Sequence, residues 1–98
     1  MTLGEKIKEL REANNMLQRQ LAAKLEMGDG YLSKIESDQK VIRREHLKTI
    51  SILFKYPYNE FAALWIGNKI YELGKDEQES LNALKVAEEQ IKYNNKKL

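Results

Sequence analysis

The fold of this chain is decided by one stretch, QRQLAAKLEMGDGYLSKIE, which runs from Gln18 to Glu36. Its apolar residues recur at helical spacing on either side of a turn of about four residues. The expected inward positions are Leu21, Ala22, Leu25, Leu32 and Ile35. The small side chain at position 22 lets two helices cross closely at a steep angle. This is the geometry of a helix-turn-helix, whose second helix enters the DNA major groove. A plain helical hairpin inside a bundle is the alternative.

Helical spacing continues on both sides of this stretch, and no segment alternates with the period of a strand. The sequence therefore predicts an all-α fold with helices over about residues 3–13, 17–25, 29–37, 43–54, 59–73 and 76–93. Thr2 and Glu5 have the spacing of a capping box at the first helix. Asn59 is the expected cap of the fifth helix, after the break at Pro57. Gly74 suits the C-terminal cap of that helix. We expect Asp76, Glu77 and Glu79 to lie at the start of the sixth helix, and residues 94–98 to fray.

Composition limits the classes of function that the chain can have. Of its 98 residues, 42 % are hydrophobic and 33 % are charged, which is typical of one small soluble domain with perhaps an added element. The absence of cysteine excludes thiolate metal sites, and the single His46 excludes a histidine-built metal site within one chain. No catalytic set and no phosphate loop are visible, so we expect no enzyme activity, no metal and no cofactor.

The apolar runs and the first residues also bear on location. No apolar run approaches the roughly 18 residues needed to cross a membrane. Met1 to Leu10 alternate charged and apolar residues, unlike a signal peptide. The expected location is the cytoplasm, away from membranes. The net charge is only +2, but a local basic excess lies between Lys40 and Lys48.

The fifth predicted helix is apolar around much of its girth and must be covered on more than one face. In a chain this short, the second cover is expected to be another copy of the protein. The predicted dimer-interface residues are Tyr58, Phe61, Leu64, Trp65 and Asn68. The sixth helix carries one narrow stripe, formed by Leu81, Leu84, Ala87 and Ile91. It could pack on the partner or brace the fifth helix.

The residues that carry a family resemblance are Gln18, Leu21-Ala22, Leu32, Ser33-Lys34 and Ile35-Glu36, followed by Leu47, Ile50, Leu53, Tyr56-Pro57 and Phe61. In these residues, over about 3–65, the chain resembles the repressor-like helix-turn-helix family of bacterial and phage regulators. Its size, the segment Leu64-Trp65-Ile66 and the sixth helix make it similar to the controller proteins of type II restriction–modification systems, in the longer class with an extra C-terminal helix.

This resemblance implies an all-α, five-helix repressor-like bundle with an additional C-terminal helix. It implies a DNA-binding domain over residues 1–74, including a dimerisation helix over 59–73, and a C-terminal helix and tail over 75–98. The implied protein is a homodimer that binds near-palindromic operators in double-stranded DNA near its own promoter. It would control restriction–modification genes, with RNA polymerase as a further possible partner.

The resemblance also assigns DNA-binding roles. Gln18 matches a position that bonds a phosphate. Its neighbour Arg19 is also expected to bind DNA. Asp29, Gly30 and Lys34 match positions that face base edges, with Ser33 and Tyr31 near them. Ser37, Gln39 and Lys40 fall where the family's loop meets the DNA backbone. Arg43 and Arg44 suit phosphates or a narrow minor groove. A solvated helix start is the alternative for Gln18 and for the two arginines, and packing against Leu17 or the turn is the alternative for Tyr31.

Two features depart from the family pattern. The family usually has glycine in the turn where this chain has Glu26, and a left-handed angle there would cost about 1 kcal/mol. This favours a rearranged turn in which Gly28 takes that angle. The recognition helix begins Gly28-Asp29-Gly30 instead of with bulky polar residues, so DNA shape is expected to supply much of the specificity. In the family, the residue matched by Glu36 forms an ion pair with a basic side chain. In this chain the candidates for that side chain are Arg11 and Lys40.

Other functions remain as alternatives at this point. A phage-type repressor or an antitoxin would contain the same module. A helical protein-interaction module that binds no DNA belongs to a different class, and Asp29 with its neighbouring glycines is the best support for it.

Overall fold

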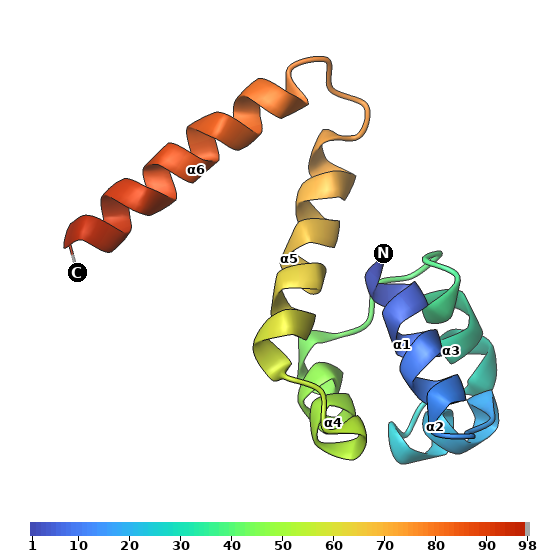
Figure 1. Ribbon diagram of the computed structural model, residues 1–98. Helices are drawn as coiled ribbons and strands as arrows, with labels where there is room; N and C mark the ends of the chain where they lie inside the picture. The colour runs from blue at the N-terminus through green and yellow to red at the C-terminus, as the bar shows by residue number, and fades with distance from the viewer. Residues whose placement is uncertain (98) are drawn as a thin grey trace. The chain divides into compact units, whose positions relative to one another are not determined.

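The computed structural model describes the backbone of residues 1–97 and the side chains of residues 1–96, and over this range it is entirely helical (Figure 1). Its helices are α1 (Leu3–Ala13), α2 (Gln18–Lys24), α3 (Asp29–Glu36), α4 (Arg44–Phe54), α5 (Tyr58–Gly74) and α6 (Ser80–Lys97). The chain divides into two compact units, Met1–Asn68 and a second that begins at Lys69 within α5. The domain boundary expected after residue 74 stays a prediction.

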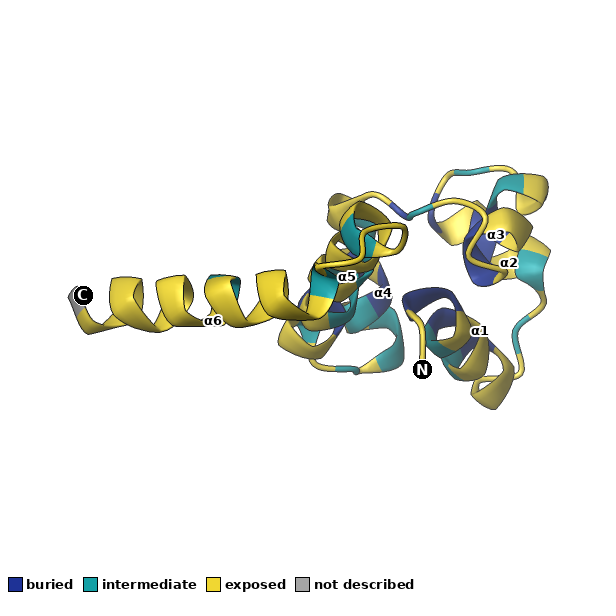
Figure 2. Ribbon diagram, turned by 90° about the horizontal axis from the view of Figure 1, so that it is seen from above, coloured by how far each residue is buried: buried dark blue, intermediate teal, exposed yellow. Residues whose placement is uncertain are grey.

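One hydrophobic core holds the first unit together. All five inward positions predicted between residues 21 and 35 are buried, which confirms that part of the prediction. The other large side chains of this core are Leu3, Ile7, Ile42, Leu47, Ile50 and Phe61. Each contributes about 1.5–3 kcal/mol by leaving water. Figure 2 shows this burial on α1, α3 and α4.

The start of α1 is fixed against the end of α3. The predicted capping box is present: the Glu5 N–H donates to the Thr2 hydroxyl over 3.1 Å, and the Thr2 N–H donates to the Glu5 carboxylate over 3.0 Å. The bond from the Thr2 N–H lowers the pKa of the Glu5 carboxyl from its ordinary value. A Cβ added at Gly4 would lie 2.4 Å from the carbonyl oxygen of Ile35. Only glycine lets the two helices approach this closely.

The helices α1 to α4 share one kind of ending. One or two residues after each helix comes a non-glycine residue with a left-handed backbone, with φ between 53° and 64°: Asn15, Glu26, Asp38 and Lys55. The next N–H then bonds back to a carbonyl five residues earlier, as in Met27 to Ala22 over 2.9 Å and Tyr56 to Ser51 over 3.0 Å. This is the Schellman motif, which normally contains glycine at the left-handed position.

The turn between α2 and α3 corrects one expectation. The left-handed angle lies at Glu26, with φ 55°, and Gly28 has an ordinary φ of −70°. The rearranged turn with Gly28 in the left-handed region is therefore wrong. The physical reason is Met27, which follows the left-handed residue and packs against the core. Its partial burial and the two backbone bonds that end α2 offset the strain at Glu26.

The bounds of α5 and α6 also differ from those predicted. The Pro57 carbonyl accepts the N–H groups of Glu60 over 3.1 Å and Phe61 over 3.4 Å, so Pro57 rather than Asn59 precedes the first turn of α5. The Ser80 hydroxyl donates to the carbonyls of Gly74 and Glu77. This hydroxyl stabilises a turn over residues 75–79, and the acidic residues 76, 77 and 79 therefore lie before α6 rather than in it.

The described part of α6 is exposed along most of its length, as Figure 2 shows. The helix continues through residue 97, so the fraying expected over 94–97 is wrong, and residue 98 lies outside the described residues. A helix that buries no side chain gains little from its own unit, and its apolar stripe stays open to solvent. Within residues 1–97, no helix combines the length and the apolar character that a membrane span requires.

Candidate nucleic-acid interface

The two faces of α3 have different functions in the first unit. Leu32 and Ile35 point into the core and are at most 2 % exposed. The exposed residues of α3 and the residue that follows it are Asp29, Gly30, Ser33, Lys34 and Ser37. These are the residues that sequence analysis assigned to DNA, together with Tyr31, which is half-buried. The residues of α3 that are predicted to contact DNA therefore share its exposed side, whereas its apolar side packs against α1 and α2.

A buried ion pair fixes the orientation of α3. The Arg11 guanidinium donates to both carboxylate oxygens of Glu36, over 2.7 and 3.0 Å, and to the carbonyl of Met16 over 2.7 Å. Both charged residues are less than 8 % exposed. The hydrogen bond to Glu36 raises the pKa of Arg11 above its ordinary value, against the opposing effect of burial. Of the two predicted partners for Glu36, Arg11 is the one in contact.

Gln18 joins this network from the start of α2. Its side-chain amide donates to Glu36 over 2.9 Å, and the residue is half-buried. Arg19 beside it is exposed. The carboxylate of Glu36 therefore connects α1, α2 and α3, and it holds the N-terminus of α2 in a constant place relative to α3. The amide of Gln18 has further hydrogen-bonding capacity on its remaining N–H and its oxygen.

The first turn of α3 contains two glycines that the fold does not require. Gly28 and Gly30 both lack a positive φ, and a Cβ added at either position would meet nothing within 4 Å. Gly30 lies inside the helix, where glycine is less stable than alanine by about 0.5–1 kcal/mol. Neither backbone strain nor internal packing accounts for these residues. They leave the backbone of the first turn accessible beside the carboxylate of Asp29.

The loop after α3 is held against that helix. The N–H groups of Gln39 and Lys40 donate to the carbonyl of Lys34 over 2.8 and 3.2 Å. The ammonium group of Lys40 lies 5.6 Å from the centre of the Tyr31 ring, a cation–π contact. The Tyr31 ring also packs against the core. These contacts hold the segment that contains Ser37, Gln39 and Lys40 beside α3. Its contact with the DNA backbone stays a prediction.

Arg43 and Arg44 lie at the start of α4 and have different surroundings. Arg43 precedes the helix, its side chain is 76 % exposed, and its guanidinium lies 3.7 Å from Glu45. Arg44 donates to the Tyr58 hydroxyl over 3.0 Å, and its guanidinium lies 5.4 Å from the Trp65 ring centre. The structure thus ties Arg44 to α5 rather than to α3. Lys48, one turn further along α4, lies 6.0 Å from the Tyr58 ring. In the sequence, the only signal for Lys48 is the basic excess that ends at this residue.

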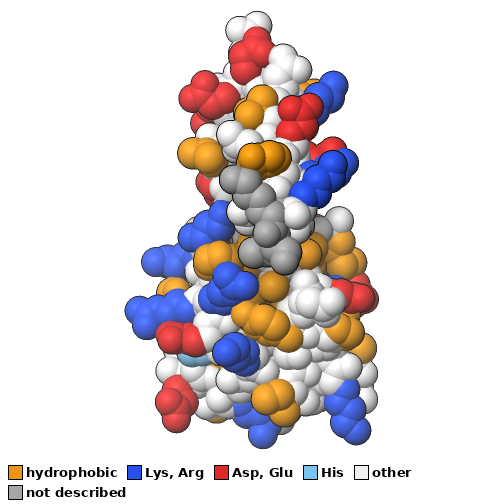
Figure 3. Space-filling view, turned by 90° about the vertical axis from the view of Figure 1, so that its left-hand side faces the viewer, with side chains coloured by type: hydrophobic (Ala, Val, Ile, Leu, Met, Phe, Trp, Pro, Cys, Tyr) orange, Lys and Arg blue, Asp and Glu red, His pale blue; other side chains and the backbone are white. Residues whose placement is uncertain are grey.

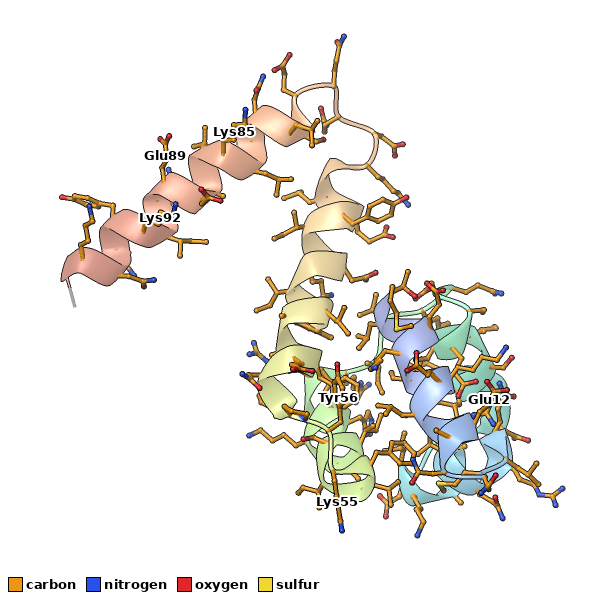
Figure 4. The ribbon with its side chains drawn as sticks, viewed as in Figure 1. Glu12, Lys55, Tyr56, Lys85, Glu89 and Lys92 are labelled. Atoms are coloured by element: carbon orange, nitrogen blue, oxygen red, sulfur yellow. The ribbon has the colours of Figure 1, made fainter. Side chains whose placement is uncertain are left out.

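The predicted interface residues of α5 fall into two groups. Tyr58, Leu64, Trp65 and Asn68 are partly exposed, and the Trp65 indole N–H donates to the Ile42 carbonyl over 2.9 Å. Phe61 is fully buried, with its ring centre 4.6 Å from that of Tyr56 (labelled in Figure 4). Phe61 therefore offers no surface to a second copy. Helical periodicity alone cannot separate a core position from a neighbouring interface position.

A comparison with protein-family models matches residues 4–64 to the helix-turn-helix domain. The match covers more than half of the chain, and the chain belongs to this family. Membership supports a DNA-binding regulator. Comparisons with curated proteins and with solved structures found no significant match. Within the described residues, no group of three or more His, Cys, Asp or Glu side chains is placed to hold a metal ion.

Proposed function

We propose that this protein is a sequence-specific transcriptional regulator that places α3 in the major groove of its operator. The observation that carries the proposal is the exposed face of α3, with Asp29, Ser33 and Lys34 on a helix fixed from behind by Arg11, Glu36 and Gln18. A helix held rigidly and exposed on one polar face has the geometry that base readout needs. The proposal gives the chain no catalytic reaction and no cofactor.

Each part of the surface has its own role in this proposal. Lys34 donates to guanine O6 and N7, and Asp29 accepts from cytosine N4. Gly30 brings the backbone close to the base edges. The remaining contacts, to phosphates and sugars, come from Gln18, Arg19, Tyr31, Ser37, Gln39, Lys40, Arg43 and Arg44. Of the two arginines, Arg43 is the more available, because Arg44 already binds Tyr58 and Trp65.

The active form in this proposal is a homodimer that pairs through α5. Tyr58, Leu64, Trp65 and Asn68 supply the interface, and the exposed side chain of Ile66, 44 % accessible, adds apolar area. Two-fold symmetry then makes the operator a near-palindrome. By resemblance, the first five helices form a repressor-like bundle. The protein acts as a controller of restriction–modification genes from a site near its own promoter, where it meets RNA polymerase.

The first experiment is a titration against labelled DNA from just upstream of its own gene. A scrambled duplex is the control, and both duplexes are tested at two salt concentrations. We expect binding of the upstream DNA alone, with a Kd of roughly 10⁻⁸ M or below, weakening as salt rises. Equal and weak binding to both duplexes would contradict specific recognition at that promoter. A footprint would then give the spacing of the half-sites.

A matched pair of lysine variants tests the role of α3. Lys34→Ala removes a base contact and is expected to weaken specific binding by about 1–3 kcal/mol, or roughly 5- to 150-fold. Lys8→Ala removes a charge from α1 that is also exposed and is expected to leave the affinity nearly unchanged. Comparing the two Kd values on the operator separates base readout from general charge. An equal loss in both variants would leave α3 without a specific role.

A further inference from the structure

The C-terminal unit has an apolar face that no described residue covers. On α6, Leu81 is 76 % exposed and Ile91 is 60 % exposed, with Leu84 between them at 43 %. Leu81 and Leu84 line one open groove with Ile70 and Leu73 from the end of α5. Figure 3 shows hydrophobic side chains exposed among acidic ones in its upper part. A contiguous apolar surface of this kind normally marks an interaction site.

The stripe on α6 is complementary to itself when a second copy runs antiparallel. A two-fold axis near residue 86 brings Leu81 of one copy beside Ile91 of the other, and Leu84 beside Ala87. All four residues share one side of the helix, because they recur at intervals of three and four. The pair Leu81 and Ile91 and the pair Leu84 and Ala87 both have their midpoint near residue 86. A single symmetric arrangement therefore covers the whole stripe in both copies.

The charges select the same arrangement. Asp76, Glu77 and Glu79 lie directly before α6, whereas Lys92 and Lys96 lie near its other end. The same two-fold axis near residue 86 brings Glu79 of one copy near Lys92 of the other, where Lys92 also has an ion pair with its own Glu88 over 3.1 Å. An antiparallel pair thus joins unlike charges at both ends. A parallel pair would place the three acids of one copy beside those of the other, which is unfavourable.

We propose that α6 is a self-association surface, on which a second copy of this chain docks its own α6 antiparallel about a two-fold axis near residue 86. This contact rests on the C-terminal unit alone, and it goes beyond the α5 interface of the proposed function. Failure of DNA binding, or of dimerisation through α5, would leave it unaffected.

Cysteine cross-linking in the full chain tests the pairing, because the parent sequence has no cysteine. A disulfide needs two Cα atoms within about 7 Å of each other. Ala87→Cys lies next to the axis and is expected to cross-link to itself. Two copies of Leu81→Cys would lie about 15 Å apart along the helix axis and would not, and the same holds for Ile91→Cys. A mixture of Leu81→Cys and Ile91→Cys is expected to form the mixed dimer.

Glu89→Cys is the matched control, because Glu89 projects from the side of α6 that faces away from the end of α5 (Figure 4). Under mild oxidation we expect Ala87→Cys to cross-link at least about tenfold faster than this control. If every variant reacts at the rate of Glu89→Cys, α6 does not pair with itself and the proposal fails. If Leu81→Cys and Ile91→Cys each cross-link to themselves as fast as Ala87→Cys, the helices are parallel and the proposal fails as well.

A charge exchange gives a second test in the Ala87→Cys background. Lys92→Glu with Lys96→Glu is expected to lower the cross-linking rate, as is the triple change of Asp76, Glu77 and Glu79 to Lys. Mixing the two variant chains restores unlike charges at both ends and is expected to restore the rate. Circular dichroism checks that each variant keeps its helices. No recovery in the mixture would contradict the antiparallel arrangement.

Discussion

Asp38 has two functions in the fold at once. Its left-handed backbone, with φ 64°, ends α3. Its carboxylate accepts the Thr2 hydroxyl over 2.7 Å and the Gly4 N–H over 3.2 Å at the start of α1. One residue thereby joins the end of the helix proposed to read DNA to the start of the chain's first helix. The strain in its backbone is offset by these bonds.

Glu26 is another residue with a left-handed backbone, and its side chain is exposed. Glu26→Gly is expected to raise the free energy of unfolding by up to about 1 kcal/mol, because glycine adopts φ 55° without strain. The control is Ala23→Gly, an exposed position inside α2, which is expected to lower it by about 0.5–1 kcal/mol. Urea unfolding of both variants measures the difference. A loss of stability in Glu26→Gly would show that its side chain makes a stabilising contact.

Among the polar interactions of the core, we expect the loss of the ion pair between Arg11 and Glu36 to lower the stability of the fold the most. Glu36→Gln leaves the Arg11 guanidinium buried without a counter-charge and is expected to cost about 3–5 kcal/mol. Glu12→Gln removes an exposed carboxylate from α1 and is expected to change stability by less than about 0.5 kcal/mol. Thermal unfolding of the two variants provides the measurement. Similar midpoints for both would mean that the buried pair is not needed for the fold.

These residues also show what the sequence could predict. The resemblance identified Arg11 as a candidate partner of Glu36, because a family pattern preserves such a pair. The left-handed angle at Glu26 could not be found from propensity, which favours glycine. The physical reason that we infer for this angle is the packing of the partly buried Met27 against the core, and local sequence does not determine such a contact.

At the scale of the helices, prediction succeeded where an apolar stripe meets a core. The helices α1 to α4 were placed to within a residue or so, because each has a buried side. The start of α6 was placed too early, because acidic residues favour a helix N-terminus in general. Here the Ser80 hydroxyl ends the turn instead. The spacing of apolar residues predicts which side of α3 is exposed. The hydrogen bond from Arg44 to Tyr58 of α5 could be found only from the structure.

The glycines of α3 lead to a prediction at this scale. Gly30→Ala is expected to raise the free energy of unfolding by about 0.5–1 kcal/mol, because the added methyl group meets no neighbour. Under the proposed function it also weakens operator binding, because the methyl group separates the backbone from the bases. Gly67→Ala, another open helical glycine, is the control that gains stability without loss of affinity. Unchanged operator affinity in Gly30→Ala would show that close approach is not used there.

At the scale of the whole molecule, the two units differ in how they are stabilised. The first unit contains the entire buried core, from Leu3 to Ala62. The described part of α6 contributes no buried residue to it. The first unit is therefore expected to fold without α6. The exposed apolar side chains of the C-terminal unit are expected to be buried only by contact with another surface.

A truncation tests this division. A chain that ends after Gly74 is expected to keep the free energy of unfolding of the first unit to within about 0.5 kcal/mol. Fluorescence of Trp65, the single tryptophan, follows that unit alone, because its indole bonds to Ile42. Helix content should fall by the contribution of α6. A chain that no longer unfolds cooperatively would show that α6 supports the core directly.

The open space around positions 28 and 30 has a consequence for evolution. The fold leaves room for a Cβ at both positions, and the backbone angles there are ones that any L-residue adopts. Substitutions at these two positions can accumulate without loss of the native structure. Under the proposed function, a lineage that carries this chain can therefore change its preferred target in single mutational steps, while selection on foldability acts elsewhere. Divergence among its descendants should begin at the first turn of α3.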